Sequence, residues 1–242
     1  GNFSLSGTQA FNMTSSGVAT LDINGNYSLT GGTHTMSSGT SVLNANGIMN
    51  VAGNFIHTGG TINESSSGLG SIVFDGTGTQ TYTSGGTVTN TINFTVNSGA
   101  TLQMAAPTTT VTGAGTFTLQ NNSTLGITSP NGITTGIGTG GTNGNIQTTG
   151  ASRSFNTAAN YIYNGSAAQT TGTGLPATVS NLTFNNSSGA VTFNAVRAIT
   201  NNFSITSGSV ANLGTFTHAT GTLTLGGAGT ASGSWGSTSS VP

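Results

Sequence analysis

Three histidines and three carboxylates are the side chains of this 242-residue chain that could bind a metal ion or transfer a proton. His34, His57 and Glu64 lie close together in the sequence and could form a small buried cluster able to hold zinc. In the simpler alternative, the two histidines are neutral and their ring nitrogens bond backbone carbonyl groups. His218 lies far along the chain from the other two. We favour the simpler alternative and expect neither a resident metal ion nor another cofactor.

A short phrase that surrounds His57 recurs through the chain and fixes the expected direction of that side chain. Residues 53–60 read GNFIHTGG. The other copies are GNFSLSG at 1–7, GNYSLTGG at 25–32 and NNFSITSG at 201–208. Where those copies have leucine or isoleucine, this one has His57, and His34 likewise aligns with Ile62 and Val210. We therefore expect both histidines to point inward from adjacent turns of a repeating structure.

The carboxylates and arginines are too scattered to predict a catalytic site. A reaction on a polysaccharide would need paired carboxylates, or acids with basic partners, along one groove. Asp22 lies between two aliphatic residues, so strand alternation turns it outward, and Asp75 precedes a glycine at an ordinary polar turn. Arg153 and Arg197 lie far beyond the last carboxylate. We predict that the chain is not an enzyme; a carbohydrate-binding or carbohydrate-degrading β-helix remains an alternative.

Tyr161 and Tyr163 are the candidate residues for contact with a carbohydrate. They alternate in the run NYIYNG and so share one face of a strand. If that face is turned outward, their rings could stack on sugars. Tyr27, in contrast, aligns with Phe3 and Phe55 in the recurring phrase, and we expect it in the core.

Repeated threonine triplets raise the alternative of an ice-binding β-solenoid. T-x-T occurs at 33–35, 79–81, 108–110, 116–118, 215–217 and 222–224. A flat array of such triplets can order water, but it needs one triplet in every coil at constant phase. The starts of these triplets are unevenly spaced, which counts against a single flat array.

Composition excludes several classes of partner. The chain has 2 basic and 3 acidic side chains, a net charge of −1 and no cysteine, whereas charged residues make up about 25% of an average protein. We therefore expect no nucleic-acid partner and no insertion into a membrane. Without cysteine there is no disulfide framework. The apolar residues are too regularly placed for a disordered chain.

Period-2 alternation of apolar residues predicts an all-β fold without significant helix. Phe117 and Leu119 share a face in TFTLQ, for example, and short strands of this kind end at small polar corners such as SSG and NSG. The phrase GN(F/Y) recurs after 24 and then 28 residues. Repeats of this length without helices predict a right-handed parallel β-solenoid with about three short strands per coil and roughly eleven coils. Asparagine and threonine side chains should form ladders between coils.

The repeats suggest two blocks of one rod. We expect β-solenoid blocks at 1–125 and 151–242, and irregular Gly/Thr-rich coils or a loop at 126–150. A longer unit marks both blocks, since FDGTGTQT at 74–81 corresponds to YNGSAAQT at 163–170. The sequence starts within a repeat, so we expect it to be part of a longer precursor whose flanking repeats are its first partners.

The unit GTGTQTYTSGG…INFTVNSGATLQM (76–104) and the closing stretch GTLTLGGAGTASGSWGSTSS (221–240) resemble the β-strand-repeat, filamentous-haemagglutinin-like large secreted surface adhesins of Bacteroidetes type. The resemblance implies a non-catalytic structural or adhesive segment, outside the cell or on its surface, exported by type IX secretion machinery. It implies a stiff stalk or fibre that contacts a surface glycan or a matrix. A self-assembling extracellular filament subunit is the alternative. The resemblance brings no catalytic residues.

Overall fold

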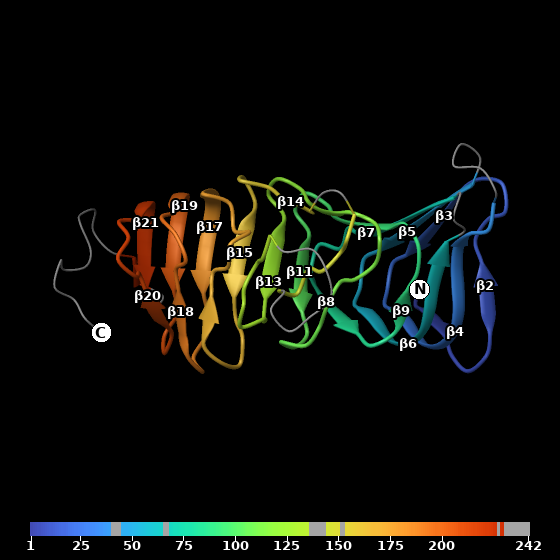
Figure 1. The fold of residues 1–242 in the computed structure, drawn as a ribbon, viewed down its shortest axis with the longest axis horizontal. Helices are drawn as coiled ribbons and strands as arrows, with labels where there is room; N and C mark the ends of the chain where they lie inside the picture. Colours follow the sequence, from blue (N-terminus) through green and yellow to red (C-terminus); the bar gives the residue numbers. More distant parts are fainter. Residues whose placement is uncertain (40–44, 65–67, 136–143, 151–152, 227, 230–242) are drawn as a thin grey trace.

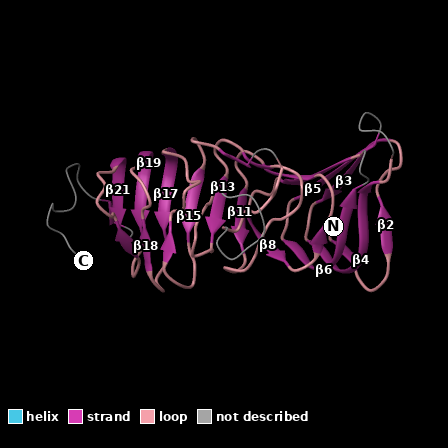
Figure 2. Ribbon diagram, viewed as in Figure 1, coloured by secondary structure: helices cyan, strands magenta, loops and turns pink. Residues whose placement is uncertain are grey.

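The computed structural model describes residues 1–39, 45–64, 68–135, 144–150, 153–226 and 228–229. Its strands follow one another along an elongated body, from β2, β3 and β4 at one end to β19, β20 and β21 at the other (Figure 1). Figure 2 shows strands joined by loops, and the described residues contain no helix. The all-β prediction is confirmed. The GSWGSTSS motif of the closing stretch lies outside the described residues.

Three sheets make up the body. The largest has thirteen strands, eleven of them on one continuous path. In spatial order these are β1 (Phe3–Leu5), β4 (Tyr27–Ser37), β6 (Phe55–Glu64), β8 (Thr79–Ser84), β11 (Thr101–Met104), β13 (Thr124–Ile127), β15 (Asn160–Tyr163), β17 (Thr178–Phe184), β19 (Ala198–Ile205), β21 (Ala219–Leu225) and β22 (Ala228–Gly229), with β2 (Ala10–Asn12) beside β4 and β9 (Thr87–Val88) beside β6.

The other two sheets lie along different halves of the chain. The six-stranded sheet runs in the order β14 (Arg153–Phe155), β12 (Phe117–Leu119), β10 (Ile92–Val96), β7 (Leu69–Phe74), β5 (Ala45–Val51) and β3 (Gly17–Ile23). The three-stranded sheet contains β16 (Gln169–Thr170), β18 (Ala190–Thr192) and β20 (Val210–Asn212).

Parallel pairing makes the chain a β-solenoid. Every strand pair except β21–β22 is parallel, so each coil returns to the same place and bonds to the coil before it. The solenoid has about nine turns, fewer than the eleven expected. The difference arises because coil length varies: Tyr27 pairs with Phe55 after a long coil, whereas Phe203 pairs with Leu223 after a short one.

A stack of aromatic rings fills the core of the first coils. Phe3, Tyr27, Phe55 and Tyr82 lie in register, with successive ring centroids 5.4, 4.7 and 5.0 Å apart and planes within 15° of parallel. Tyr27, Phe55 and Tyr82 are fully buried, as predicted for the first two. Each such pair adds about 0.5–1.5 kcal/mol to the free energy gained by burial.

Asparagine ladders join the coils at their edges, as predicted. The backbone N–H of Asn26 donates to Oδ1 of Asn2, that of Asn54 to Asn26, and that of Thr81 to Asn54, each at 2.8 Å. Every bond joins one coil to the next. Each asparagine oxygen thus satisfies a backbone N–H of the next coil without a charged group.

Two buried glutamines explain the longer repeated unit. Gln80 accepts a hydrogen bond from Gly76 N–H and donates to the carbonyl oxygens of Val51 and Gly53 in the preceding coil, at 2.9, 2.6 and 2.8 Å. Gln169 does the same in the second copy, accepting from its own turn at 2.7 Å and donating to two carbonyls at 3.0 Å. The glutamine of both units therefore has a structural role.

The segment predicted as irregular, 126–150, leaves the sheets continuous. β12 pairs directly with β14, and β13 with β15. Leu125 and Tyr161 are therefore register partners in neighbouring strands, although a long coil separates them in the sequence. Arg153 donates to the carbonyl oxygens of Ile146 and Thr135, at 2.6 and 3.0 Å. One guanidinium thus holds two parts of this coil; residues 136–143 and 151–152 lie outside the description.

Candidate functional site

A polar groove of about 290 Å³ lies beside His57 and is the candidate site. It is bounded by the first part of β6 and the end of β8, where His57 pairs with Ser84, and by the segment that follows β11. The residues with hydroxyl-bearing side chains that line it are Tyr82, Ser84, Thr108, Thr110 and Thr112. The Ser84 hydroxyl already takes part in a hydrogen bond, because its Oγ accepts the backbone N–H of Thr110 at 2.9 Å.

His57 forms the buried wall of this groove. Its side chain is 1% exposed, and Nε2 lies 3.4 Å from the carbonyl oxygen of Gly60. Burial lowers the pKa of His57 to about 4, against a smaller opposing effect of the Gly60 carbonyl. A Cβ on Gly86 would lie 2.1 Å from Nε2, so the ring needs glycine at that position. The histidine is therefore neutral at neutral pH.

His34 is buried in an aromatic cage rather than at a carbonyl. Its Nδ1 lies 2.9 Å from the Tyr27 hydroxyl, and its ring is 5.4 Å from Phe3 and 5.2 Å from Phe11 between centroids. Nε2 has no hydrogen-bond partner among the described residues. Burial, and secondarily the charge of His57, lowers the pKa of His34 to about 4. The inward direction predicted for both histidines is confirmed, whereas the carbonyl partner predicted for His34 is wrong.

Glu64 does not join the two histidines. Its Oε1 accepts the backbone N–H of Thr91 at 2.8 Å, and its backbone pairs with Ser37. Burial raises the pKa of the Glu64 carboxyl, against the opposing hydrogen bonds from Thr91 and Gly68. Within the part of the chain that the structure describes, no group of three His, Cys, Asp or Glu side chains could hold a metal ion. His34, His57 and Glu64 are thus separate structural groups.

Tyr161 and Tyr163 are core residues, so their predicted role as outward sugar contacts is wrong. They are 1% and 0% exposed. The hydroxyl of Tyr161 donates to the carbonyl oxygen of Asn156 at 2.7 Å, and that of Tyr163 donates to Thr171 at 2.6 Å. Alternation placed both rings on one face correctly, but that face is the inner one, where each ring fills the core and its hydroxyl reaches a corner carbonyl.

The remaining charged groups do not converge on the groove. Asp22 is exposed and accepts a 2.6 Å hydrogen bond from Asn50, which confirms its outward direction. Asp75 is also exposed. The pKa of its carboxyl is raised, mainly by desolvation and to a smaller extent by the negative charge of Asp22. Arg197 is 6% exposed and donates to the carbonyl oxygen of Val196, while its Nε has no partner among the described residues. His218 accepts the Arg197 backbone N–H.

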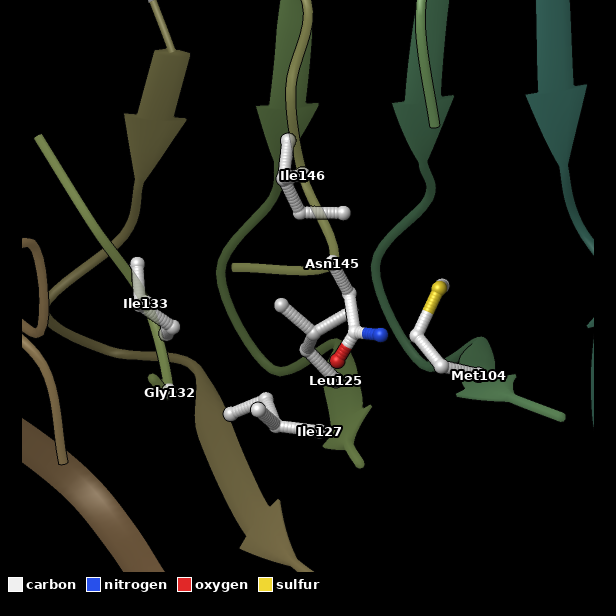
Figure 3. A pocket seen from close by; sticks show the side chains of 7 residues that line it. All are labelled: Met104, Leu125, Ile127, Gly132, Ile133, Asn145 and Ile146. Atoms are coloured by element: carbon white, nitrogen blue, oxygen red, sulfur yellow. The ribbon is translucent and has the colours of Figure 1, made fainter. Parts of the chain in front are cut away.

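A second internal space has no room for a water molecule. Figure 3 shows its lining of Met104, Leu125, Ile127, Gly132, Ile133, Asn145 and Ile146. Asn145 accepts the backbone N–H groups of Thr128 and Ser129 at 2.9 Å and donates to the carbonyl of Thr109 at 2.7 Å. This space belongs to the core, and Asn145 closes the long coil as the two glutamines close theirs.

A regular polar array covers the outer face of the main sheet. One row, which we call the outer rank, consists of Thr79, Thr101, Thr124, Asn160, Asn181, Asn202 and Thr222 in successive coils. Hydrogen bonds link its last five members: Asn160 Nδ2 donates to Thr124 Oγ1, Asn181 Nδ2 to Asn160 Oδ1 at 2.7 Å, and Thr222 Oγ1 to Asn202 Oδ1 at 2.8 Å, while the backbone N–H of Asn202 donates to Asn181 Oδ1. The array is uncharged and held at fixed spacing.

The outer rank changes the interpretation of the threonine triplets. The triplets 79–81 and 222–224 lie in the same two rows, because register is kept while coil length varies. Uneven spacing in the sequence therefore does not exclude constant phase. The coils between them carry asparagine at three positions of the rank, so the array mixes hydroxyl and amide groups.

No family model, curated protein or solved structure matches the chain. Across the described residues, no helix is long and apolar enough to cross a membrane. The groove at His57 can accept a small neutral polar group through its hydroxyls. Among the described residues that line it, none is a carboxylate or an arginine, and the groups beside the neutral histidine are hydroxyls and glycine backbone.

Proposed function

We propose that this chain is a non-catalytic structural segment of a large exported surface protein, in which it forms a stiff stalk for attachment to a surface or matrix. A β-solenoid is consistent with a structural or adhesive role. The observation that carries the proposal is the unbroken bonding between coils, since the main sheet pairs without interruption from β1 to β21.

Stiffness follows from three kinds of contact that run along the rod. Backbone ladders join every pair of neighbouring coils. Stacked rings join the first four coils through the core, and side-chain bonds of the outer rank join the later coils outside it. Bending the rod would open these contacts on one side. Because they lie at different distances from its axis, bending is resisted in more than one direction.

The nearly uncharged exterior suits a stalk that works outside the cell. With 2 basic and 3 acidic side chains, few groups respond to salt or pH. Such surfaces also approach one another with little charge repulsion. The extracellular localisation, the type IX export route and the glycan or matrix contacts implied by the resemblance to large surface adhesins belong to the same proposal.

A display experiment tests the stalk directly. The chain is placed between a cell-surface anchor and an epitope, and compared with a Gly/Ser linker of equal length. The rod should hold the epitope at one distance from the membrane, measured by energy transfer, whereas the linker should give a broad distribution. An equally broad distribution for the chain would refute the stalk.

The outer rank favours ice binding as a second candidate function, because it presents neutral hydroxyl and amide groups at the repeat of the coils, about 4.8 Å. Ice recrystallisation should then be inhibited by the chain and not by an Asn181→Lys variant. Thr118→Lys, on the six-stranded sheet, is the matched control. If the unmodified chain leaves ice recrystallisation unchanged, this candidate is excluded.

A further inference from the structure

The hydroxyl of Tyr82 differs from those of the other buried tyrosines. The hydroxyl of Tyr27 lies 2.9 Å from a His34 nitrogen, and those of Tyr161 and Tyr163 donate to backbone carbonyls. The Tyr82 side chain is 1% exposed, yet its hydroxyl has no hydrogen-bond partner among the described residues. Tyr82 lines the groove beside His57, and its hydroxyl oxygen is not sealed off by protein atoms. Because buried hydroxyls are normally bonded, its partner must come from whatever occupies the groove.

His57 offers the complementary group in the same groove. Its Nε2 lies 3.4 Å from the carbonyl oxygen of Gly60, which can only accept a hydrogen bond. The neutral ring therefore carries its proton on Nε2, and Nδ1 is an acceptor. Nδ1 has no hydrogen-bond partner among the described residues. The groove thus combines a donor on Tyr82 with an acceptor on His57, and the chain satisfies neither.

A row of threonines forms the opposite wall. Thr109 and Val111 are buried, whereas Thr108, Thr110 and Thr112, which alternate with them, line the groove. The hydroxyls of these three threonines make no hydrogen bond to another described residue. Each can therefore donate to a ligand and accept from it.

Backbone bonds hold this wall in place on both sides. The backbone N–H of Thr110 donates to Ser84 Oγ, which ties the wall to the end of β8. From behind, Val111 N–H donates to the Asn145 carbonyl, and Gln147 N–H donates to the Val111 carbonyl, each at 2.8 Å. A groove fixed in this way loses little conformational freedom when a ligand enters.

The size and charge of the groove restrict the class of ligand. Its volume of about 290 Å³ lies at the lower end of the roughly 300–1,000 Å³ found for ligand pockets, so it suits a single ring. No described lining residue is a carboxylate or an arginine, and a charged ligand would lose water without gaining a counter-charge. Val88 adds an apolar contact. A ring that carries several neutral hydroxyl groups can accept from Tyr82 and donate to His57.

We propose that the groove between β8 and the segment after β11 binds one neutral sugar ring, whose hydroxyl groups bond to Tyr82, His57 and the row of threonines. Its biological meaning rests on the proposed stalk, to which it gives a glycan contact at a defined place on the rod. Tyr82 is the donor that orients the ring, His57 the acceptor, and the threonines supply adaptable bonds along its side.

A titration of the full chain with free sugars tests the site. Glucose, galactose, mannose and N-acetylglucosamine are the neutral probes, glucuronate is the charged comparison, and nuclear magnetic resonance follows the ring signals of Tyr82 and His57. At least one neutral sugar should shift both sets of signals and reach saturation at millimolar concentration, with glucuronate binding more weakly.

Two matched variants locate the binding. Tyr82→Phe keeps the stacked ring and breaks no bond within the described chain, so it should fold and bind the sugar roughly three- to tenfold more weakly. Thr110→Val removes a groove hydroxyl and should also weaken binding. Thr101→Val makes the same replacement in the outer rank, away from the groove, and should leave the affinity unchanged.

The proposal is overturned if none of the four neutral sugars shifts the Tyr82 and His57 signals, or if glucuronate binds more tightly than all of them. It is also overturned if Thr110→Val and Thr101→Val bind alike, a comparison that decides even where Tyr82→Phe does not fold. The display experiment contains no sugar, so a failure here leaves the stalk standing, and a broad distance distribution there leaves the measured sugar affinity unaffected.

Discussion

Changing Gln80 to glutamate gives a sharp test of the buried hydrogen bonds between coils. In the native chain, the amide of Gln80 accepts one backbone hydrogen bond and donates two, and the side chain is 1% exposed. A carboxylate can accept from Gly76 but repels the carbonyl oxygens of Val51 and Gly53. Two lost donors leave two buried carbonyls unpaired beside a buried charge. We expect a loss of about 3–5 kcal/mol at neutral pH.

The loss should depend on pH. A protonated carboxyl group at this position can again donate one hydrogen bond, which recovers about 2 kcal/mol and corresponds to a folded-state pKa raised by about 1.5 units, to about 6. A carboxyl with a raised pKa binds its proton more tightly in the folded state. The recovered stability is therefore complete below the unfolded pKa of about 4.3, and is lost as pH rises towards about 6.

Denaturant unfolding from about pH 3.5 to about pH 8, followed by circular dichroism, measures this difference. Gln9→Glu is the matched control, because Gln9 is exposed, and its unfolding midpoint should differ little from that of the native chain at any pH. A Gln80→Glu variant as stable as the native chain at the alkaline end of this range would refute the role assigned to the glutamine. A loss that stays constant across the whole range would refute the hydrogen-bond argument.

Two further predictions concern the core of the first coils. Phe55→Ala, within the ring stack, should cost about 3–5 kcal/mol, whereas Phe3→Ala at its open end should cost roughly half as much; equal unfolding losses for the two variants would contradict the stack. His34 and His57 have folded pKa values of about 4, below the ordinary 6.5, so the stability they provide is present above pH 6.5 and is lost as pH falls towards 4. Replacing both histidines by leucine should reduce the loss of unfolding free energy between pH 6.5 and pH 4. If that loss is unchanged in the double variant, the two histidines are not held neutral by burial.

The fold was predictable because the same pattern of apolar and polar residues recurs many times along the chain. Alternating apolar residues, polar corners and the recurring GN(F/Y) phrase all indicate stacked parallel strands, and Tyr27 and Phe55 lie where the alignment places them. The number of coils was not predictable by the same reasoning. Coils differ widely in length, since register partners lie 36 residues apart at Leu125 and Tyr161 but 20 apart at Phe203 and Leu223, so one repeat length read from the sequence does not fix the count.

The site could be predicted only in part. Aligning His57 with leucines located its inward direction, but sequence could not show that Gly86 leaves room for the ring or that the segment after β11 borders a groove. Alternation gave Tyr161 and Tyr163 a common face without saying which face is buried. The role of Gln80 was missed, although its recurrence as Gln169 at the same place in the longer unit was the available signal.

The distance between Thr79 and Thr222 tests the central claim most directly. Both side chains are exposed and the chain has no cysteine, so Thr79→Cys and Thr222→Cys can carry spin labels without competing thiols. They lie six coil steps apart in the outer rank. At about 4.8 Å per step, pulsed electron resonance should find a narrow distribution near about 29 Å between backbone positions. A broad distribution, or a distance that follows the number of residues instead of the number of coils, would contradict the rod.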